Sequence, residues 1–532
     1  MPLDRRISIG IAIVIVVSSF SGCLWFDKTT FSLIASIAYD DDGFASLSLT
    51  FNASDVISLT LSGPDTGVVF SDTFYRGTTT ATIPLASYRA QPSPGSYLLQ
   101  VHDDRDNQIF EKEYFYEGEN LAVSRVVAQW WNEHVWEETQ SLVGLNITVT
   151  NHGDLPAYPH RAEVTVANKS ASGLVLPDVV LPGHTTTRCC FVYIEDVPQV
   201  QQVLNLVVKN TEETVMTSTS YLVSPEENVS TLNYSWRYRG NRYLSVPDPD
   251  CLVDYYSRLD RLVVEDYAAY VFDGYDDHYV DMIVEKFLDL FDHLFDPPLD
   301  DVDFVNAVAS FVQNMEYAED DPADPECEYP RYPLEMLKVK QGDCEDTAIL
   351  AAALLDTMGY NVTLLRLPDH MAVGVHLDEN ASHFEYYIAE YYYLETTREN
   401  WLLGRVPSEY SNTSNVTIYP ISSRPLLLHK WKNATRYTST DGKDFVKMKI
   451  LVENIGSGAA EDAAVKGAFF AEVTPTLYYN QEVAVISSLD AREKKEVYLE
   501  ITVPKGVATM LKTQLFLNNT MVDEKESTSL FT

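Results

Sequence analysis

Short runs in which apolar and polar residues alternate occupy both ends of this chain. The alternation is clear at 47–51 (LSLTF) and 56–61 (VISLTL), and at 94–103 a turn leads into a further run of this kind. Because successive side chains of a strand point to opposite faces, the pattern predicts strands with one buried face. We therefore predict three all-β sandwich modules, with the boundaries 24–118, 119–224 and 426–532.

The second and third modules share a local motif. ITVTNHGDLPA at 147–157 and ILVENIGSGAA at 450–460 each run from a strand into Asn-x-Gly and a turn of small residues. In this they resemble the immunoglobulin-like surface modules that accompany extracellular enzymes. Sandwich modules of this kind build stalks or binding faces. We expect them to act as spacers or as surfaces that contact other surface proteins or glycans.

The stretch 225–425 between these modules has a different pattern. Apolar residues recur at helical spacing over 252–272, 279–295 and 302–315, and a further apolar helix follows at 337–358. Strand patterns come after this helix, and helices followed by a strand meander are typical of an α+β domain. The expected fold class is a multidomain chain whose central α+β domain is flanked by all-β immunoglobulin-like sandwiches.

A single cysteine begins the last of these helices. Cys344 follows Asp343, a favoured N-cap residue, and Asp346 completes a capping-box-like pair. Gly359 is a typical residue to end the helix. The free N–H groups and the dipole of the first turn are expected to lower the pKa of Cys344 and to raise its thiolate fraction. This placement favours a nucleophile.

A nucleophilic cysteine also needs a base and a group that orients the base. Downstream, 362–367 reads as a strand, His370 opens a second strand, and a third strand at 386–394 ends in Glu395. The ends of adjacent strands lie about 5 Å apart. An imidazole on one strand is therefore close enough to bridge the thiol of Cys344 and a carboxylate on the next strand.

Three segments around these residues are similar to a known family: EYPRYPLEMLKVKQGDCEDTAIL (328–350), LPDHMAVGV (367–375) and YYYLETTRENWLLGRVP (391–407). Together they make the stretch 302–410 resemble a transglutaminase-like domain of the papain-related thiol fold, in an archaeal extracellular branch. The resemblance implies Cys344 as nucleophile, His370 as base and Glu395 as the carboxylate that orients the base. It also implies an enzyme that acts on amide bonds of proteins or peptides.

The chain departs from the family pattern at two positions. The third member is usually aspartate, so the longer side chain of Glu395 must still reach the distal nitrogen of the imidazole. His370 is followed by Met371 and Ala372 where Ala-Trp is common. The aromatic wall near the base is therefore either absent or supplied by another part of the chain.

Other residues remain candidates for these positions. His376 and His383 are alternative bases, and Asp369 is an alternative orienting carboxylate beside His370. A side chain on a turn rarely points back at the adjacent ring, which argues against Asp369. A cysteine at a helix start is most often structural, so an intact fold without activity also stays open.

The N-terminus has the composition of an export signal. Arg5 and Arg6 precede the apolar run 7–20, and the tetrapeptide that ends at Cys23 (FSGC) resembles a lipoprotein box. The resemblance implies a signal segment 1–23 and lipid attachment at Cys23. The alternative is an uncleaved anchor helix, although the run is shorter than the roughly 20 residues that span a bilayer. Either version predicts a protein on the extracellular face of the cell membrane.

Sequons and cysteines agree with export. Outside the cell disulfides persist, and Cys251 with Cys327 is the pair that we would test first. The adjacent Cys189 and Cys190 would point to opposite faces of a strand. Eleven Asn-x-Ser/Thr sequons indicate a glycoprotein; they begin at Asn52, Asn146, Asn168, Asn228, Asn233, Asn361, Asn380, Asn412, Asn415, Asn433 and Asn518.

The formal net charge of −40 is concentrated, since 248–330 holds 24 acidic and three basic residues. Because phosphate contact needs a basic face, we exclude nucleic acid as a partner. A solvated acidic surface is the ordinary explanation, and a divalent-cation site near 300–303 or 319–321 stays open. No oxygen-ligand loop and no zinc spacing is recognisable. We therefore predict no metal ligands and no cofactor.

These features predict a surface-anchored enzyme whose Cys344 attacks an amide carbonyl. His370 takes the thiol proton and later protonates the leaving amine, Glu395 holds the ring, and the Cys344 backbone N–H donates to the oxyanion. The acyl-enzyme then reacts with an amine, which gives cross-linking, or with water, which gives hydrolysis. The competing prediction is a non-catalytic adhesion or scaffold protein that binds partners through its β modules.

Overall fold

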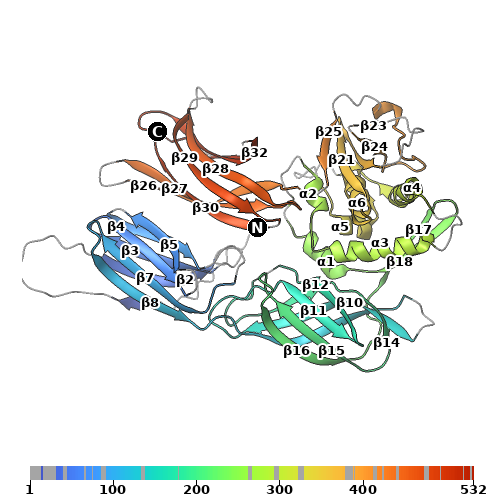
Figure 1. Cartoon of the computed structure of the whole chain (residues 1–532), viewed down its shortest axis with the longest axis horizontal. Helices are drawn as coiled ribbons and strands as arrows, with labels where there is room; N and C mark the ends of the chain where they lie inside the picture. The colour runs from blue at the N-terminus through green and yellow to red at the C-terminus, as the bar shows by residue number, and fades with distance from the viewer. Residues whose placement is uncertain are drawn as a thin grey trace, which may run out of the picture.

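The structure is a computed structural model that describes most of the chain. Antiparallel sheets dominate it, and all of the described α-helices lie between residues 250 and 357 (Figure 1). The protein is therefore a β-rich chain of several structural units. The described residues are 13–15, 31–39, 45–64, 67–74, 76–85, 91–133, 138–177, 179–259, 261, 266–292, 299–320, 329–377, 387–388, 390–410, 416–421, 424–438, 443–471, 478–491, 493–518, 520–527 and 530–531.

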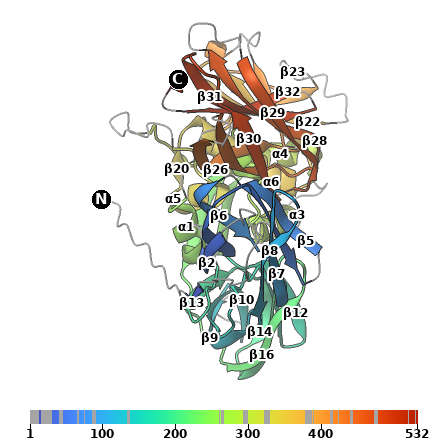
Figure 2. The same cartoon turned by 90° about the vertical axis from the view of Figure 1, so that its left-hand side faces the viewer.

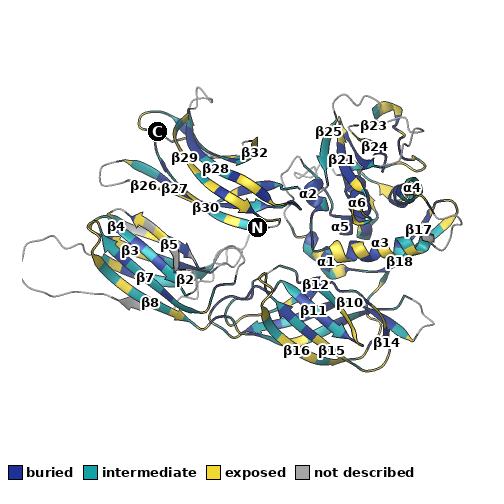
Figure 3. Ribbon diagram, viewed as in Figure 1, coloured by how far each residue is buried: buried dark blue, intermediate teal, exposed yellow. Residues whose placement is uncertain are grey.

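The N-terminal β unit consists of two four-stranded antiparallel sheets. One sheet has the order β1-β2-β3-β6, with β1 (Ile13–Ile15), β2 (Phe31–Tyr39), β3 (Ala45–Ala53) and β6 (Gly77–Pro84). The other has the order β5-β4-β7-β8, with β4 (Ile57–Gly63), β5 (Gly67–Phe74), β7 (Gly95–Asp103) and β8 (Gln108–Tyr116). Alternate residues such as Leu47, Leu49, Leu59 and Leu61 are buried between the sheets, and the alternation is visible along the strands in Figure 3.

The second β unit is built in the same way from eight strands. In one sheet β10 (Thr139–Asn151) pairs with β9 (Leu121–Trp131), β13 (Thr185–Cys190) and β14 (Ile194–Pro198). The other sheet has the order β12-β11-β15-β16, with β11 (Arg161–Val166), β12 (Lys169–Leu174), β15 (Gln202–Lys209) and β16 (Val215–Val223). Its apolar core lies between the two sheets.

The C-terminal β unit again packs two sheets around an apolar core. Its first sheet has the order β26-β27-β30, with β26 (Leu427–Thr438), β27 (Asp444–Asn454) and β30 (Lys494–Thr502). Its second has the order β29-β28-β31-β32, with β28 (Ala460–Ala471), β29 (Tyr478–Leu489), β31 (Thr509–Leu517) and β32 (Thr520–Glu526).

The Asn-x-Gly motif has the same structure in the second and C-terminal units. Asn151 and Asn454 are fully buried, and each Oδ1 accepts the backbone N–H two residues on, from Gly153 at 3.0 Å and from Gly456 at 3.1 Å. Each Nδ2 donates to the carbonyl four residues on, at 2.7 and 2.8 Å. A Cβ at either glycine would approach a backbone oxygen within 2.1 or 2.3 Å, so both positions require glycine.

Asn454→Ala should therefore loosen the turn that follows β27. The substitution leaves three carbonyls and two N–H groups without their buried partner, which costs about 1–3 kcal/mol. Amide hydrogen exchange at 454–458 should become faster and thermal unfolding should begin earlier. Ser488→Ala, at an exposed position on β29, is the control. Unchanged exchange at 454–458 in Asn454→Ala would contradict the structural role of the motif.

The central unit begins with a hairpin and a layer of helices. The hairpin joins β17 (Thr231–Arg237) to β18 (Asn241–Pro247). The α-helices are α1 (Asp250–Tyr256), α2 (Ala268–Val271), α3 (Asp277–Asp292), α4 (Asp301–Val312), α5 (Pro333–Val339) and α6 (Cys344–Thr357). The helix predicted over 252–272 is wrong as a single element, because α1 ends at Tyr256 and α2 is one turn. The rings of Tyr256 and Tyr270 both pack against Tyr332, which lets these two short helices cover the same part of α5.

A five-stranded antiparallel sheet completes the central unit. Its order is β23-β24-β22-β21-β25, with β21 (Asn361–Leu367), β22 (His370–His376), β23 (Tyr387–Ile388), β24 (Tyr391–Leu394) and β25 (Thr417–Pro420). The predicted strand 386–394 is thus two short strands, joined at Glu390 with a φ of 78°. Helix α6 packs on β21 and β22 and lies between this sheet and the other helices (Figure 1). Its buried alanines allow that close packing.

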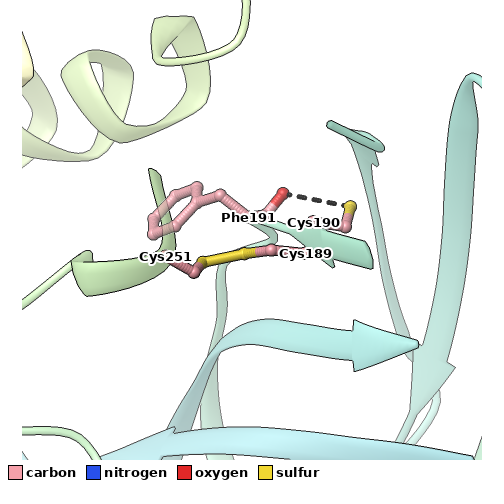
Figure 4. The surroundings of a disulfide bond; sticks show 4 residues. All are labelled: Cys189, Cys190, Phe191 and Cys251. Atoms are coloured by element: carbon pink, nitrogen blue, oxygen red, sulfur yellow. Dashed lines mark hydrogen bonds between the residues drawn. A yellow bond between two sulfur atoms is a disulfide. The ribbon is translucent and has the colours of Figure 1, made fainter. Parts of the chain in front are cut away.

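A disulfide fastens the second β unit to the central unit. Cys189 on β13 is bonded to Cys251 on α1, with the Cα atoms 6.3 Å apart (Figure 4). The expected pairing of Cys251 with Cys327 is therefore wrong, because the outer face of β13 brings Cys189 to α1; Cys327 lies outside the described residues. Cys190 points the other way, into the core, where its thiol donates to the Phe191 carbonyl at 3.6 Å (Figure 4). Burial raises the pKa of Cys190 to about 12.

The N-terminal and C-terminal β units are in contact. The N-terminal and C-terminal β units lie side by side in both views (Figures 1 and 2). Lys447 Nζ on β27 donates to the Thr73 carbonyl on β5 at 3.1 Å, and the rings of Phe70 and Tyr498 make an edge contact at 6.5 Å.

The predicted signal segment is described only at β1, which pairs with β2. Cys23 lies outside the described residues. No helix that the structure describes is long and apolar enough to cross a membrane.

Candidate active site

Cys344 is the first residue of α6, as the sequence predicts. Asp343 is the N-cap, and a capping box links it reciprocally to Asp346. The preceding Gly342 lies against the Asp346 side chain, where a Cβ would come within 2.4 Å of Oδ2. The helix ends at Met358 and Gly359, and Gly359 has a φ of 88°. The Cys344 side chain is half-buried.

His370 and Glu395 meet at the ends of neighbouring strands. His370 is the first residue of β22, and Glu395 directly follows β24, which pairs with β22 in the register Val373↔Leu394. His370 Nε2 lies 3.1 Å from Glu395 Oε2, and both side chains are buried. The longer glutamate side chain thus reaches the distal nitrogen of the imidazole. The Nδ1 edge of the ring is left for another partner.

Hydrogen bonds hold the Glu395 carboxylate in place. Tyr393 Oη donates to Oε2 at 2.7 Å, and Thr397 donates to Oε1 through its backbone N–H at 3.0 Å and its hydroxyl at 2.6 Å. Gln313 Nε2 on α4 donates to the Glu395 carbonyl at 2.8 Å. Burial alone would raise the pKa of Glu395, but His370 and Thr397 together lower it to about 2. The carboxylate is therefore charged at every pH at which the protein is expected to work.

This environment predicts a loss of stability in acid. A pKa lowered from 4.5 to about 2 contributes roughly 3 kcal/mol above pH 4.5, and this contribution disappears as the pH falls from 4.5 through 2. Urea unfolding at pH 6 should find wild type more stable than Glu395→Gln. The difference should shrink at pH 3. Glu399→Gln, at an exposed position nearby, should match wild type at both pH values. A difference that is independent of pH would contradict this reading of the charge.

An aromatic ring that the sequence analysis did not identify lies flat on His370. The Tyr410 ring stacks on the imidazole with centroids 4.0 Å apart and planes 4° apart. Tyr410 ends the short 3-10 helix η1 (Ser408–Tyr410), where Glu409 pairs with Arg398 at 2.6 Å. The aromatic wall near the base therefore comes from residue 410 and not from the position after the histidine.

The thiol of Cys344 lies close to the strand end that carries His370. The backbone N–H of Met371, the residue after His370, is near enough to the Cys344 sulfur to favour the charged form of the thiol. One turn into α6, Thr347 Oγ1 lies 3.0 Å from Thr396 Oγ1, the residue after Glu395. These two contacts fix the start of α6 against the strand ends that carry the imidazole and the carboxylate.

The electrostatic surroundings of Cys344 differ from the expectation. Burial, the charges of Glu345 and Asp343 and the hydrogen bond from the thiol to Glu345 Oε2 at 3.3 Å raise the pKa of Cys344. The prediction of a lowered pKa is wrong for this arrangement, because the next residue in the first turn is itself a buried carboxylate. Burial and Asp343 also raise the pKa of Glu345 to about 9. Cys344 is therefore a neutral thiol that needs a base.

The alternative candidates lie away from this arrangement. Asp369 is exposed on the turn between β21 and β22, with a φ of 58°. The Nδ1 atom of His376 lies 2.9 Å from the Glu390 carbonyl at the far end of β22. His383 lies outside the described residues.

Tyr393 could have been found from the sequence, since it lies two residues before Glu395 and so on the same face of the strand.

The described carboxylates of the two suggested cation sites have other partners in the structure. In the 300–303 segment, Asp300 caps α4 and Asp303 pairs with Arg239. Among the described residues of the 319–321 segment, Asp320 instead lies beside Asp343 and Glu345, which flank the thiol.

A separate cavity lies between the second β unit and the central unit. Its volume is about 620 Å³, and its lining includes Glu133, Glu195, Asp289 and Lys286. Lys286 pairs with Glu133 at 2.6 Å. None of the three predicted active-site residues lines this cavity.

Comparisons with known proteins leave the family open. No known protein family and no curated protein matches the chain. Among solved structures, red sea bream transglutaminase matches with 9% identity and a TM-score of 0.19 over 90% of this chain and 79% of that chain. Amycolatopsis orientalis exo-chitosanase CsxA matches with 8% identity and a TM-score of 0.15 over 91% and 76%. A beta-glycosidase from Bacteroides vulgatus matches with 11% identity and a TM-score of 0.13 over 38% of this chain and 25% of that chain. TM-scores this low carry no argument for a shared fold.

Proposed function

We propose that the protein is a transglutaminase-like cysteine enzyme that acts on amide bonds of proteins or peptides. The observation that carries the proposal is the buried His370–Glu395 pair, which lies beside a cysteine at a helix N-terminus. The transglutaminase-like segments in the sequence support the same assignment. Burial of a charged carboxylate costs free energy, and in Glu395 hydrogen bonds and the facing imidazole offset that cost. Carboxylates with a pKa shifted by such partners are often found at functional sites.

The proposed reaction begins with the neutral thiol. His370 takes the Cys344 proton as the sulfur attacks the amide carbonyl carbon, and Glu395 stabilises the imidazolium that forms. The Cys344 backbone N–H, at the N-terminus of α6, donates to the oxyanion of the tetrahedral intermediate. His370 then returns the proton to the leaving nitrogen as the C–N bond breaks. The thioester that remains is opened by a primary amine or by water.

The same proposal places the enzyme outside the cell. The lipoprotein-like segment that ends at Cys23 and the sequons support attachment to the extracellular face of the membrane. Proteins or peptides are the proposed substrates. The β units are proposed to hold the central unit away from the membrane, with surface proteins or glycans as their contacts.

A binding function without catalysis is the second candidate. The cavity of about 620 Å³ beside the second β unit favours it, because that cavity offers a binding surface independent of Cys344. A scaffold of this kind would bind its partners equally well with Cys344 replaced by alanine.

One assay separates these functions. The full chain is incubated with glutamine-containing peptides and a fluorescent primary amine in ¹⁸O-labelled water. The masses of the products are then measured by mass spectrometry. Amine incorporation indicates transfer, and ¹⁸O incorporation at a new carboxylate indicates hydrolysis. Either product in wild type and neither in Cys344→Ala is the expected result. No product from wild type across a broad peptide library would favour the scaffold.

A further inference from the structure

Three carboxylates from two segments of the sequence converge beside Cys344. One oxygen each from Asp320, Asp343 and Glu345 lies within 4.8 Å of the others. The parallel pair of β19 (Glu316–Tyr317) and β20 (Gln341–Gly342) brings these segments together, and the Ala318 N–H donates to the Gly342 carbonyl at 2.9 Å. The fold therefore holds the three side chains in one place.

The buried member of this cluster lacks a hydrogen-bond partner on one oxygen. Glu345 is only 6% exposed. Its Oε2 accepts the Cys344 thiol, while no described residue donates a hydrogen bond to its buried Oε1. A buried carboxylate oxygen in this state costs free energy unless a proton donor or a cation meets it.

The cationic side chains that the structure describes do not balance these charges. Arg331 approaches Asp320 at 3.5 Å, but its main partner is the fully buried Asp346, which also accepts the Arg331 backbone N–H at 2.7 Å. One guanidinium thus faces the cluster and Asp346 together. Carboxylate groups at such short separations repel one another strongly in a partly buried site.

We propose that Asp320, Asp343 and Glu345 bind a hard divalent cation directly beside the thiol of Cys344. Oxygen-only donors select cations such as Ca²⁺ or Mg²⁺, and water completes their coordination. Ca²⁺ is favoured because it accepts irregular geometry and carboxylates that bind through one or both oxygens. The site would also hold Glu345 in a fixed position next to the nucleophile. Binding is independent of the proposed acyl transfer, since it requires no turnover.

The test is calorimetric titration of the intact protein with CaCl₂ at about 0.15 M NaCl, where diffuse surface attraction is screened. Wild type should bind one Ca²⁺ per chain, and Asp320→Asn should bind it at least about tenfold more weakly. Glu319→Gln removes an exposed carboxylate from the neighbouring residue and should bind as wild type does. Cys344→Ala should also retain binding, which separates this site from the proposed catalysis.

A second measurement guards against a folding defect in Asp320→Asn. Because Ca²⁺ binds the folded state, it should raise the thermal unfolding temperature of wild type and Glu319→Gln but not that of Asp320→Asn or Glu345→Gln. Absence of saturable binding by wild type would overturn the proposal. Equal weakening in Asp320→Asn and Glu319→Gln would also overturn it, because the cation would then be held by the acidic surface in general.

Discussion

Cys344→Ala should abolish turnover while the protein stays folded. The sulfur is the atom that forms the covalent intermediate, and loss of a nucleophile costs up to about 10⁶-fold in the catalytic rate constant of a comparable triad. The side chain is small and half-buried, so its truncation leaves no large cavity. The measurement is amine incorporation or peptide hydrolysis, with circular dichroism as the check on folding.

Cys190→Ala is the matched control for this prediction. Cys190 is a free thiol like Cys344, but it is buried in the core of the second β unit. Its replacement should leave the rate constant close to that of wild type. Activity that survives Cys344→Ala, or that depends on Cys190, would show that the assigned nucleophile is wrong.

Glu395→Gln should reduce turnover by as much as about 10⁴-fold, the loss described for the equivalent change in a serine triad. In the structure, the three donors from Thr396 and Thr397 meet Oε1, while Oε2 faces His370. The amide oxygen of the glutamine will therefore take the Oε1 position, and its NH₂ group will donate to His370 Nε2. This fixes the imidazole in the tautomer that carries its proton on Nδ1, which cannot accept the thiol proton.

Two further variants test whether turnover depends on the position or on the charge of the carboxylate near His370. Glu395→Asp keeps the charge and should retain part of the activity if the backbone relaxes toward His370. Asp369→Asn changes an exposed carboxylate next to the histidine and should be nearly neutral. A large loss in Asp369→Asn with little loss in Glu395→Gln would reverse the assignment of the orienting residue.

The elements around the candidate site could be predicted because local pattern decides them. The N-cap at Asp343, the apolar positions of α6 and Gly359 mark one helix from end to end. The apolar runs of β21 and β22, separated by the turn at Pro368 and Asp369, mark the hairpin that carries His370. The order of these elements was enough to bring the histidine and Glu395 together, since consecutive antiparallel strands are usually neighbours.

Features that depend on contacts between distant segments could not be predicted in this way. The stacking of Tyr410 on His370, the approach of Asp320 to Glu345 and the disulfide from Cys189 to Cys251 each join segments with no shared local pattern. The pKa of Cys344 was predicted in the wrong direction for the same reason. The helix dipole is visible in the sequence, whereas the burial of Glu345 beside the thiol is a result of tertiary packing.

The most direct test of the central claim is the rate at which iodoacetamide alkylates Cys344 at pH 7–8, followed by peptide mass spectrometry in wild type and His370→Ala. We expect Cys344 to react before Cys190 in wild type, because it is the more exposed thiol and has a base beside it. Removal of the imidazole should slow its alkylation at least about tenfold, since base assistance is commonly worth about 10²–10⁴-fold. Equal rates in the two proteins would contradict the claim that His370 activates Cys344.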